Sequence, residues 1–256
     1  MLKTWLAHPI TRGLDLDDPQ TTHLRLQIIR EKGFLRQIYY EWYAQVVDAL
    51  PTGRGLVLEL GSGAGFLADF IPDLITSEVF YCPGVRTVLD GQRLPFGDGT
   101  LRAIVMTNVL HHLAEPRHFL NEATRCVRTS GRVIAIEPWV TPWSQLIYRR
   151  LHHEPFYPEA RDWGFSRSGP LSGANGALPW IIFGRDRAQF EREFPEWQIQ
   201  KVKPMMPFRY LVSGGISLRS LMPGWTFGTW RWLEDALTPW MKNLAMFAQI
   251  VLQHTA

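Results

Sequence analysis

The sequence predicts an α/β fold with a mostly parallel, seven-stranded sheet and helices on both faces. Short apolar runs alternate with longer segments of helical pattern, which is typical of strands joined by helices. Two of these runs, residues 56–60 and 101–106, are almost wholly apolar, as buried parallel strands are. The chain has 256 residues, of which 46% are hydrophobic, enough for one large domain with insertions.

Composition excludes several classes of protein. The net charge of +3 comes without a long basic run, so we expect no nucleic-acid partner. Two cysteines, Cys82 and Cys126, do not suggest a disulfide framework. We recognise no signal peptide and no apolar stretch long enough to span a bilayer, and therefore expect a cytoplasmic protein.

Two helices are expected before the first strand, after an irregular segment 1–20. The first would begin at Thr21 or Thr22 and run to about Lys32, with Gly33 as its stop. The second, residues 34–50, is rich in aromatic side chains and ends at Pro51-Thr52-Gly53.

The first strand ends in glycines at alternate positions, Gly61, Gly63 and Gly65. Such a turn lets the backbone approach a ligand closely, and a short helix, expected over 66–70, would direct free N–H groups toward it. The nicotinamide and flavin fingerprint G-x-G-x-x-G needs a glycine where Phe66 stands. The turn therefore does not favour a dinucleotide cofactor.

The next strands place polar residues where ligands bind in open α/β sheets. Glu78 lies near the end of the second strand, 74–79, where a carboxylate can accept from both ribose hydroxyls. The third strand, 85–89, follows after a turn or a shortened helix and leads into Asp90-Gly91. Asn108 and His111 follow the fourth strand.

The remaining segments complete the pattern of helices and strands. A loop at 152–158 and a glycine- and serine-rich segment at 166–176 are long enough to be functional or mobile. Helices are expected at 116–127, 141–151 and 186–194, an apolar segment at 177–183, a turn at 129–131, and strands at 132–137, 197–203 and 247–252.

Several motifs together resemble the class I S-adenosylmethionine-dependent methyltransferases. Glu59-x-Gly61-x-Gly63-x-Gly65 is similar to motif I of that family. Asp90 followed by Leu94-Pro95-Phe96 resembles the D-x-x-x-LPF segment of its small-molecule members. Residues 110–112 (Leu-His-His) and 129–131 (Thr-Ser-Gly) also stand where the family has similar motifs. The resemblance implies an enzyme with a Rossmann-like fold, an antiparallel last strand and S-adenosyl-L-methionine as cofactor.

The resemblance also implies roles for particular residues. Asp90 would accept from the adenine amino group; the alternative is that it caps a turn. If the acceptor is a hydroxyl, a base must take its proton, and His111 is the first candidate and His153 the second. The expected cofactor-binding residues are Glu59, near the methionine portion, with Gly61, Gly63, Gly65, Glu78, Asp90, Gly91 and Asn108.

Four segments are expected within one structural domain. Residues 1–50 would form a helical lid and 51–139 the cofactor-binding core. Residues 140–196 would form an insertion on the substrate side, and 197–256 the last two strands with a tryptophan-rich insertion. The aromatic residues Tyr39, Tyr40 and Tyr43 of the lid either face the cofactor or dock the helix on the sheet.

A metal site is not expected. His152, His153 and Glu154 offer ligands, but the adjacent histidines lack the i, i+4 spacing of the helical zinc motif. The sequence leaves open whether His111-His112 and His152-His153 meet in space.

We expect methyl transfer to a small metabolite, at oxygen. The segment after strand four lacks an Asn-Pro-Pro-Tyr type motif, which argues against methylation of nucleic-acid bases. One alternative is an enzyme that methylates a lipid or a lipid-linked saccharide at a membrane surface, and another is a non-catalytic scaffold that binds the cofactor or a partner. The tryptophan-rich insertion would cover an apolar acceptor, contact lipid or a partner, or fill the core of a cap. The oligomeric state is left open.

Overall fold

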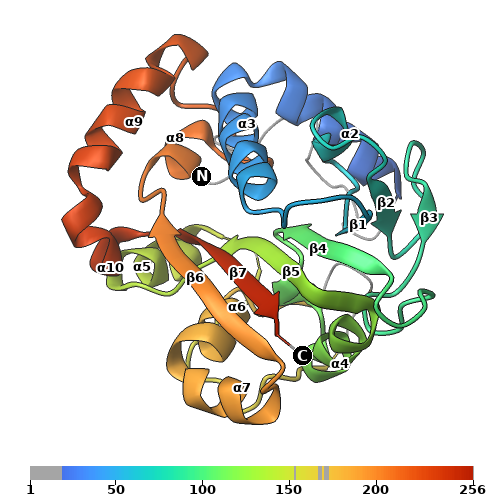
Figure 1. Ribbon diagram of the computed structural model, residues 1–256. Coiled ribbons are helices and arrows are strands. Elements are labelled where there is room, and N and C mark those ends of the chain that lie inside the picture. Colours follow the sequence, from blue (N-terminus) through green and yellow to red (C-terminus); the bar gives the residue numbers. More distant parts are fainter. Residues whose placement is uncertain (1–18, 153, 167–168, 170–172, 256) are drawn as a thin grey trace.

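The protein is described by a computed structural model, in which residues 19–152, 154–166, 169 and 173–255 are placed. The strands are β1 (Leu56–Leu60), β2 (Ile75–Glu78), β3 (Thr87–Val88), β4 (Leu101–Thr107), β5 (Val127–Pro138), β6 (Trp197–Met205) and β7 (Phe247–His254). They form one sheet in the order β3-β2-β1-β4-β5-β7-β6 (Figure 1). Strands β1 to β5 pair in parallel, and β7 is antiparallel to both β5 and β6. The predicted Rossmann-like fold with an antiparallel last strand is confirmed.

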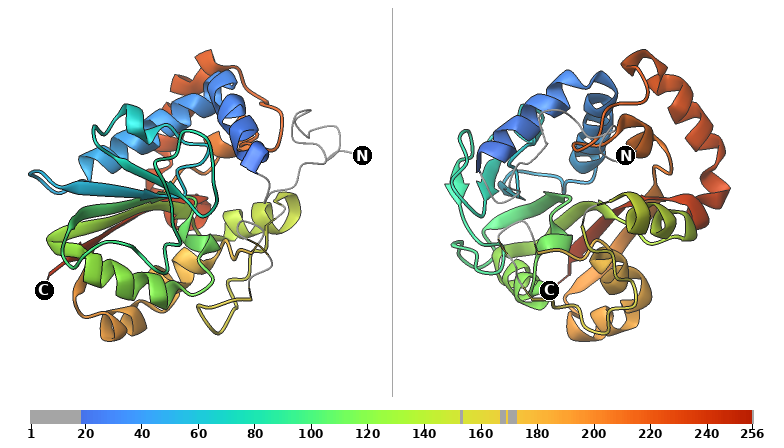
Figure 2. Two further views of the ribbon diagram at one scale, coloured as in Figure 1. Left: turned by 90° about the vertical axis from the view of Figure 1, so that its right-hand side faces the viewer. Right: turned by 180° about the vertical axis from the view of Figure 1, so that it is seen from behind.

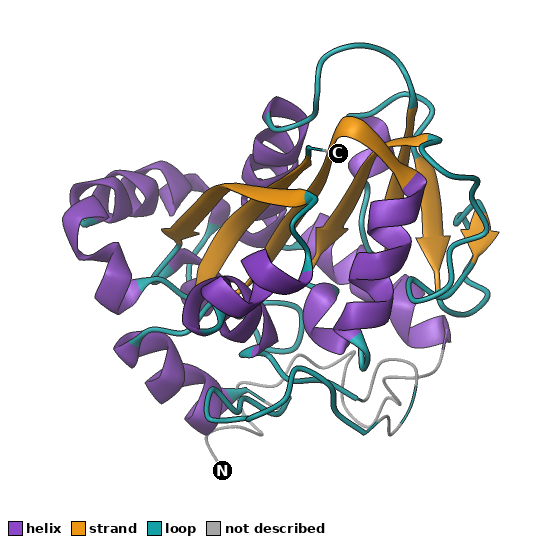
Figure 3. Cartoon of the chain, turned by 60° about the horizontal axis from the view of Figure 1, so that its bottom comes forward, coloured by secondary structure: helices purple, strands orange, loops and turns teal. Residues whose placement is uncertain are grey.

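Helices cover both faces of this sheet (Figures 1 and 3). The α-helices are α2 (Pro19–Glu31), α3 (Gly33–Asp48), α4 (Pro116–Cys126), α5 (Pro142–Leu151), α6 (Leu178–Trp180), α7 (Arg187–Glu193), α8 (Arg209–Ser213), α9 (Phe227–Ala236) and α10 (Met241–Leu244). Helices α2 and α3 lie on one face and α4 and α7 on the other, while α9 lies at the outside of the molecule (Figure 2). Because both faces are covered, β1, β4 and β5 are buried along most of their length.

The segment after the glycine turn differs from the expected short helix. It is one 3₁₀ turn, η2 (Leu67–Asp69). Pro72 follows directly and supplies no backbone N–H, so the helix does not continue. Segment 79–86 contains no helix, as expected for the shortened connection between the second and third strands.

The expected turn at 129–131 is a bulge inside β5 rather than the start of that strand. Val127 already pairs with Leu101, and the pairing resumes only between Arg132 and Ala103. At Gly131 a Cβ would lie 2.5 Å from Val127 Cγ1, so only glycine fits where the chain folds back on itself.

The segment between β6 and β7 is tied to the N-terminal helices. Lys32, at the junction of α2 and α3, donates from Nζ to the carbonyls of Gly215 and Leu218. Burial lowers the pKa of Lys32 to about 8. These contacts hold residues 214–218 against α2 and α3.

A buried arginine makes a second connection between these segments. The Arg209 guanidinium donates to Glu41 of α3 at 2.6 and 3.0 Å and to Glu234 of α9 at 2.5 Å. Glu234 also accepts from the backbone N–H groups of Phe208 and Arg209, which begin α8. One ionic network therefore joins α3, α8 and α9.

Three of the four tryptophans of the insertion do not fill a core, whereas Trp230 is partly buried against it. Trp225, Trp232 and Trp240 are 86%, 68% and 54% exposed, whereas Trp42 and Trp163 are fully buried. None of the described helices is long and apolar enough to cross a membrane. Both cysteines, Cys82 and Cys126, are buried free thiols.

Replacing Arg209 by methionine is expected to lower the free energy of unfolding by about 3–5 kcal/mol, because the 2%-exposed Glu234 would lose its partner. Urea unfolding of the whole chain measures this change. Arg187→Met is the control, because its pair with Glu191 is exposed and contributes less than about 0.5 kcal/mol. Equal losses in the two variants would contradict the proposed network.

Candidate functional site

The three glycines after β1 are required by close contacts. A Cβ at Gly61, whose φ is +64°, would lie 2.5 Å from Val109 Cγ2. At Gly63 it would lie 2.8 Å from Glu78 Oε2, and at Gly65 2.7 Å from the Tyr43 hydroxyl. Any larger residue would push these neighbours away.

Local partners already use several N–H groups of this turn. The Gly63 N–H donates to Glu78 Oε2 at 3.1 Å, and the Phe66 N–H donates to the Tyr43 hydroxyl at 3.2 Å. The Gly65 N–H donates to the Ser62 carbonyl at 2.6 Å. The turn is therefore shaped by side chains of β2 and α3 rather than by a long helix.

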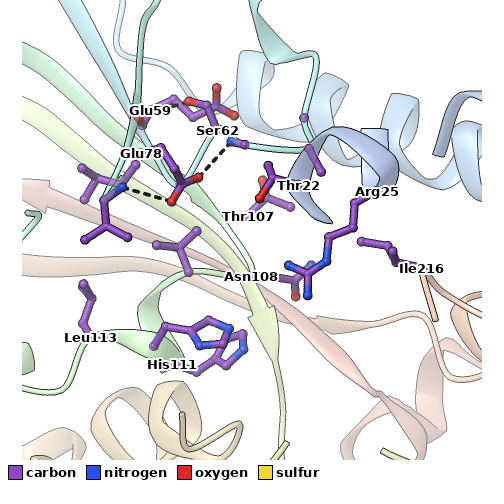
Figure 4. Close-up of a pocket in the computed structure, with 18 of the residues that line it drawn as sticks. Thr22, Arg25, Glu59, Ser62, Glu78, Thr107, Asn108, His111, Leu113 and Ile216 are labelled. Atoms are coloured by element: carbon purple, nitrogen blue, oxygen red, sulfur yellow. Dashed lines mark hydrogen bonds between the residues drawn. The ribbon is translucent and has the colours of Figure 1, made fainter. Parts of the chain in front are cut away.

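A cavity of about 240 Å³ lies at the carboxyl ends of β1, β2 and β4 (Figure 4). This is the edge at which open α/β sheets bind ligands. The structure brings all the residues predicted to bind the cofactor to the wall of this cavity: Glu59, Gly61, Gly63, Gly65, Glu78, Asp90, Gly91 and Asn108. His111 lines it as well.

Burial disfavours the ionised form of two carboxyl groups on the cavity wall. Burial raises the pKa of Glu59 to about 7, against a hydrogen bond from Ser62 that lowers it. Burial also raises the pKa of Glu78, although its carboxylate accepts from the N–H groups of Val79 and Gly63. A cation bound beside Glu59 would favour its ionised form.

Asp90 and Asn108 occupy turns at the cavity wall. Asp90 Oδ1 accepts from the backbone N–H of Gln92 at 2.9 Å and from its side-chain amide at 3.1 Å. Asp90 thus caps a turn, the alternative considered for it, and lines the cavity as well. Asn108 has a φ of +58°, a conformation that asparagine tolerates better than most residues.

Several lining residues were not anticipated from the sequence. Thr22 and Arg25 of α2 lie over the glycine turn, and Figure 4 shows Arg25 directed toward the cavity. Tyr210 of α8 and Ile216, from the tryptophan-rich insertion, also line the cavity, and Figure 4 shows Ile216 beside Arg25. Their sequence carries no motif, and only the packing of α2 and the insertion over the sheet edge brings them here. The lid tyrosines Tyr39 and Tyr43 also line the cavity, whereas Tyr40 is 45% exposed.

His111 is held by a buried carboxyl group that the sequence did not single out. Its Nδ1–H donates to Glu137 Oε2 at 2.6 Å, and both side chains are almost fully buried. Glu137 Oε1 accepts from the N–H groups of Val109 and Leu110 at 2.8 Å each. Glu137 thereby fixes the loop after β4 and the orientation of the His111 ring.

Glu154 approaches the same histidines from the loop after α5. Its carboxylate oxygens lie 3.4 Å from His111 Nε2 and 3.8 Å from His112 Nε2. The His152 Nδ1 accepts from the Glu154 N–H at 3.3 Å and thus helps to place this residue. His153, the second predicted base, lies outside the described residues.

These contacts shift the pKa values of His111, His112 and Glu154. Burial lowers the pKa of His111, but the hydrogen bond and charge of Glu137, aided by Glu154, raise it to about 10 overall. Burial and the charge of His111 lower the pKa of His112 to about 4. Burial of Glu154 is outweighed by His111, which holds the pKa of this carboxyl well below its usual value. Glu137 and Glu154 thus favour the protonated form of His111, which would have to lose this proton before it could act as the predicted base.

One family model matches a short central segment of the chain. Residues 83–135 match the family described as methyltransferase domain. No curated protein matches the chain in sequence.

Solved structures resemble the whole fold at low identity. One is a chain of the complex between the Haloferax volcanii Trm112 methyltransferase activator and a methyltransferase, with 13% identity, a TM-score of 0.53, and coverage of 90% of this chain and 95% of that chain. A geranyl diphosphate methyltransferase in complex with SAM has 14% identity, a TM-score of 0.52, and coverage of 98% and 96%. The geranyl diphosphate C-methyltransferase of Streptomyces coelicolor A3(2) has 13% identity, a TM-score of 0.51, and coverage of 98% and 87%.

At these identities the structural likeness shows the fold alone. The class of protein rests on the match to the methyltransferase domain. The match to a methyltransferase domain agrees with the class predicted from the sequence.

Proposed function

We propose that the protein binds S-adenosyl-L-methionine in the 240 Å³ cavity and transfers its methyl group to an oxygen of a small metabolite. The observation that carries this proposal is the gathering of the predicted cofactor residues around one cavity at the carboxyl edge of the sheet. Eight residues that span positions 59 to 108 of the chain line it, together with His111.

The cavity offers suitable partners for each part of the cofactor. Glu59 would pair with the ammonium of the methionine portion, because a cation favours the ionised form of this buried carboxyl. Glu78 would accept from the ribose hydroxyls, since each carboxylate oxygen retains a lone pair beyond its bond to Gly63 or Val79. Asp90 and the backbone of Gly91 would contact the adenine edge.

The chemistry is a displacement at the methyl carbon. The acceptor oxygen forms a bond to this carbon, the sulfur–carbon bond breaks with its electron pair left on sulfur, and the acceptor proton passes to solvent. The chain's main contribution is to align oxygen, methyl and sulfur. The rings of Tyr39 and Tyr210, which line the cavity, would stabilise the sulfonium.

The acceptor would enter beside His111 and Glu154. With His111 protonated, its ring cannot take the acceptor proton, but the Glu154 carboxylate beside it can accept a hydrogen bond from a hydroxyl of the acceptor and orient it. His153 remains a predicted base.

Isothermal titration with S-adenosylmethionine and S-adenosylhomocysteine tests the proposal. We expect micromolar binding to the wild-type chain and a loss of at least about 100-fold in Gly63→Arg, because any side chain there collides with Glu78. Gly228→Arg is the matched control, since a Cβ at Gly228 meets nothing within 4 Å. If the folded wild-type protein binds neither compound, the proposal fails.

The affinity for S-adenosylhomocysteine is expected to rise with pH. The pKa of Glu59 is about 7, and its ionised form pairs with the ligand's ammonium, so binding should strengthen about tenfold between pH 6 and pH 8. Titrations at several pH values measure this slope, and Glu59→Gln should flatten it. A wild-type affinity that does not change with pH would contradict the role given to Glu59.

A second candidate function is methylation of a lipid or lipid-linked saccharide at a membrane surface. It is favoured by three exposed tryptophans, Trp225, Trp232 and Trp240, in the insertion that also contributes Ile216 to the cavity. Tryptophan suits a boundary between water and lipid, and the exposed Arg231 would contact anionic headgroups.

Sedimentation with anionic liposomes at low salt tests this candidate. The wild-type chain should co-sediment, and a triple Trp225→Ser, Trp232→Ser, Trp240→Ser variant should lose most of this association. A Tyr81→Ser, Tyr157→Ser variant removes exposed rings elsewhere and should behave as wild type. Absence of wild-type sedimentation, or equal loss in both variants, would exclude the candidate.

A further inference from the structure

Two neighbouring histidines and a distant glutamate meet at one side of the cavity. His111 and His112 belong to the 3₁₀ turn η3 (Leu110–His112) after β4, and Glu154 comes from the loop after α5. One ligand atom from each of the three lies within 4.8 Å of the other two. In the described part of the chain, no other set of three histidine, cysteine or carboxylate side chains converges in this way.

Both histidines present the same nitrogen to Glu154. The Nδ1–H of His111 donates to Glu137 Oε2 at 2.6 Å, and the Nδ1–H of His112 donates to the Gly173 carbonyl at 3.1 Å. These acceptors leave each Nε2 directed toward the Glu154 carboxylate. A carboxylate or carbonyl behind the ring is the usual outer partner of a metal-binding histidine, because it fixes the ring and raises its basicity.

The distances between these groups suit a metal better than a direct ion pair. A charged N–H···O hydrogen bond is about 2.7–2.9 Å long. The contacts from Glu154 to His111 Nε2 and His112 Nε2 are 3.4 and 3.8 Å. Two ligands at about 2.0–2.2 Å from one tetrahedral ion lie about 3.4 Å apart. On the other side of the His111 ring, the contact between Nδ1 and Glu137 has the short length of a direct ion pair.

We propose that His111 Nε2, His112 Nε2 and the Glu154 carboxylate bind a divalent transition-metal ion on the cavity wall. Glu137 and the Gly173 carbonyl act as the outer partners of the two rings, and His152 positions Glu154 through its backbone N–H.

The ligand set indicates which ions fit. Two imidazoles with one carboxylate are found in catalytic zinc sites and in non-haem iron sites, which keep a position open for water or substrate. Magnesium prefers oxygen ligands in octahedral geometry, and two imidazoles do not suit it. We therefore expect Zn²⁺ or Co²⁺ to bind, with Mg²⁺ a poor competitor.

The position of the site gives the ion a role that rests on the proposed function. His111, His112 and Glu154 all line the cavity in which the acceptor would lie. An oxygen of the acceptor can take an open position on the ion, which lowers the pKa of a hydroxyl and favours its deprotonation.

The experiment uses the untagged full chain, stripped with EDTA and dialysed. Zn²⁺ affinity is measured by competition with a chromophoric chelator, with and without excess Mg²⁺, and Co²⁺ is followed by its visible absorption. The variants Glu154→Gln and His112→Asn remove single ligands. His118→Asn, at an exposed position, is the control for loss of an imidazole. Circular dichroism shows whether each variant is folded.

We expect one Zn²⁺ per wild-type chain and an intense Co²⁺ spectrum of low coordination number. Each ligand variant should bind Zn²⁺ at least about 100-fold more weakly, since loss of an outer partner alone costs about 10–100-fold. The His118→Asn variant should match wild type. Absence of stoichiometric binding in the wild-type chain, or equal affinity in folded Glu154→Gln, would overturn the metal site.

The same samples separate this inference from the proposed function. Zn²⁺ binding without S-adenosylmethionine binding would keep the metal site and remove the cofactor assignment. Cofactor binding without Zn²⁺ binding would remove the metal site alone.

Discussion

The site depends on the hydrogen bonds that the buried carboxyl group of Glu137 accepts. It lies at the end of β5 and accepts hydrogen bonds from Val109, Leu110 and His111, which all belong to the loop after β4. A buried carboxyl needs such partners, because an unpaired one would be costly. The neighbouring parallel strands β4 and β5 bring the two segments together, and the same bonds direct His111 Nε2 toward Glu154.

The other side of the cavity depends on a different buried network. Arg209 joins α3, α8 and α9, while Lys32 holds the carbonyls of Gly215 and Leu218. These contacts place Ile216 and Tyr210 at the cavity wall, although both residues lie more than a hundred positions from the glycine turn in the sequence. The cavity is therefore shared between the carboxyl edge of the sheet and a cover formed by the N-terminal helices and the insertion between β6 and β7. The cover also presents the exposed tryptophans, so one insertion faces both the cavity and the solvent.

One part of the cavity wall links the two proposals. Glu137 and Glu154 flank His111 and raise the pKa of its ring against the effect of burial, while burial lowers the pKa of His112. In the proposed methyl transfer this wall would orient the acceptor. The proposed ligands of the metal ion, His111, His112 and Glu154, belong to the same wall.

The sequence by itself determined the sheet, the glycine turn and the eight predicted residues on the cavity wall. Strand periodicity and the spacing of Gly61, Gly63, Glu78 and Asp90 are local, and a parallel sheet always aligns the carboxyl ends of its strands. Only the tertiary structure decided the charge of His111 and the approach of Glu154. Those depend on which side chains from distant segments are buried together, and burial shifts a pKa by amounts that no local pattern records. The same reason explains why Arg25 and Ile216 were missed.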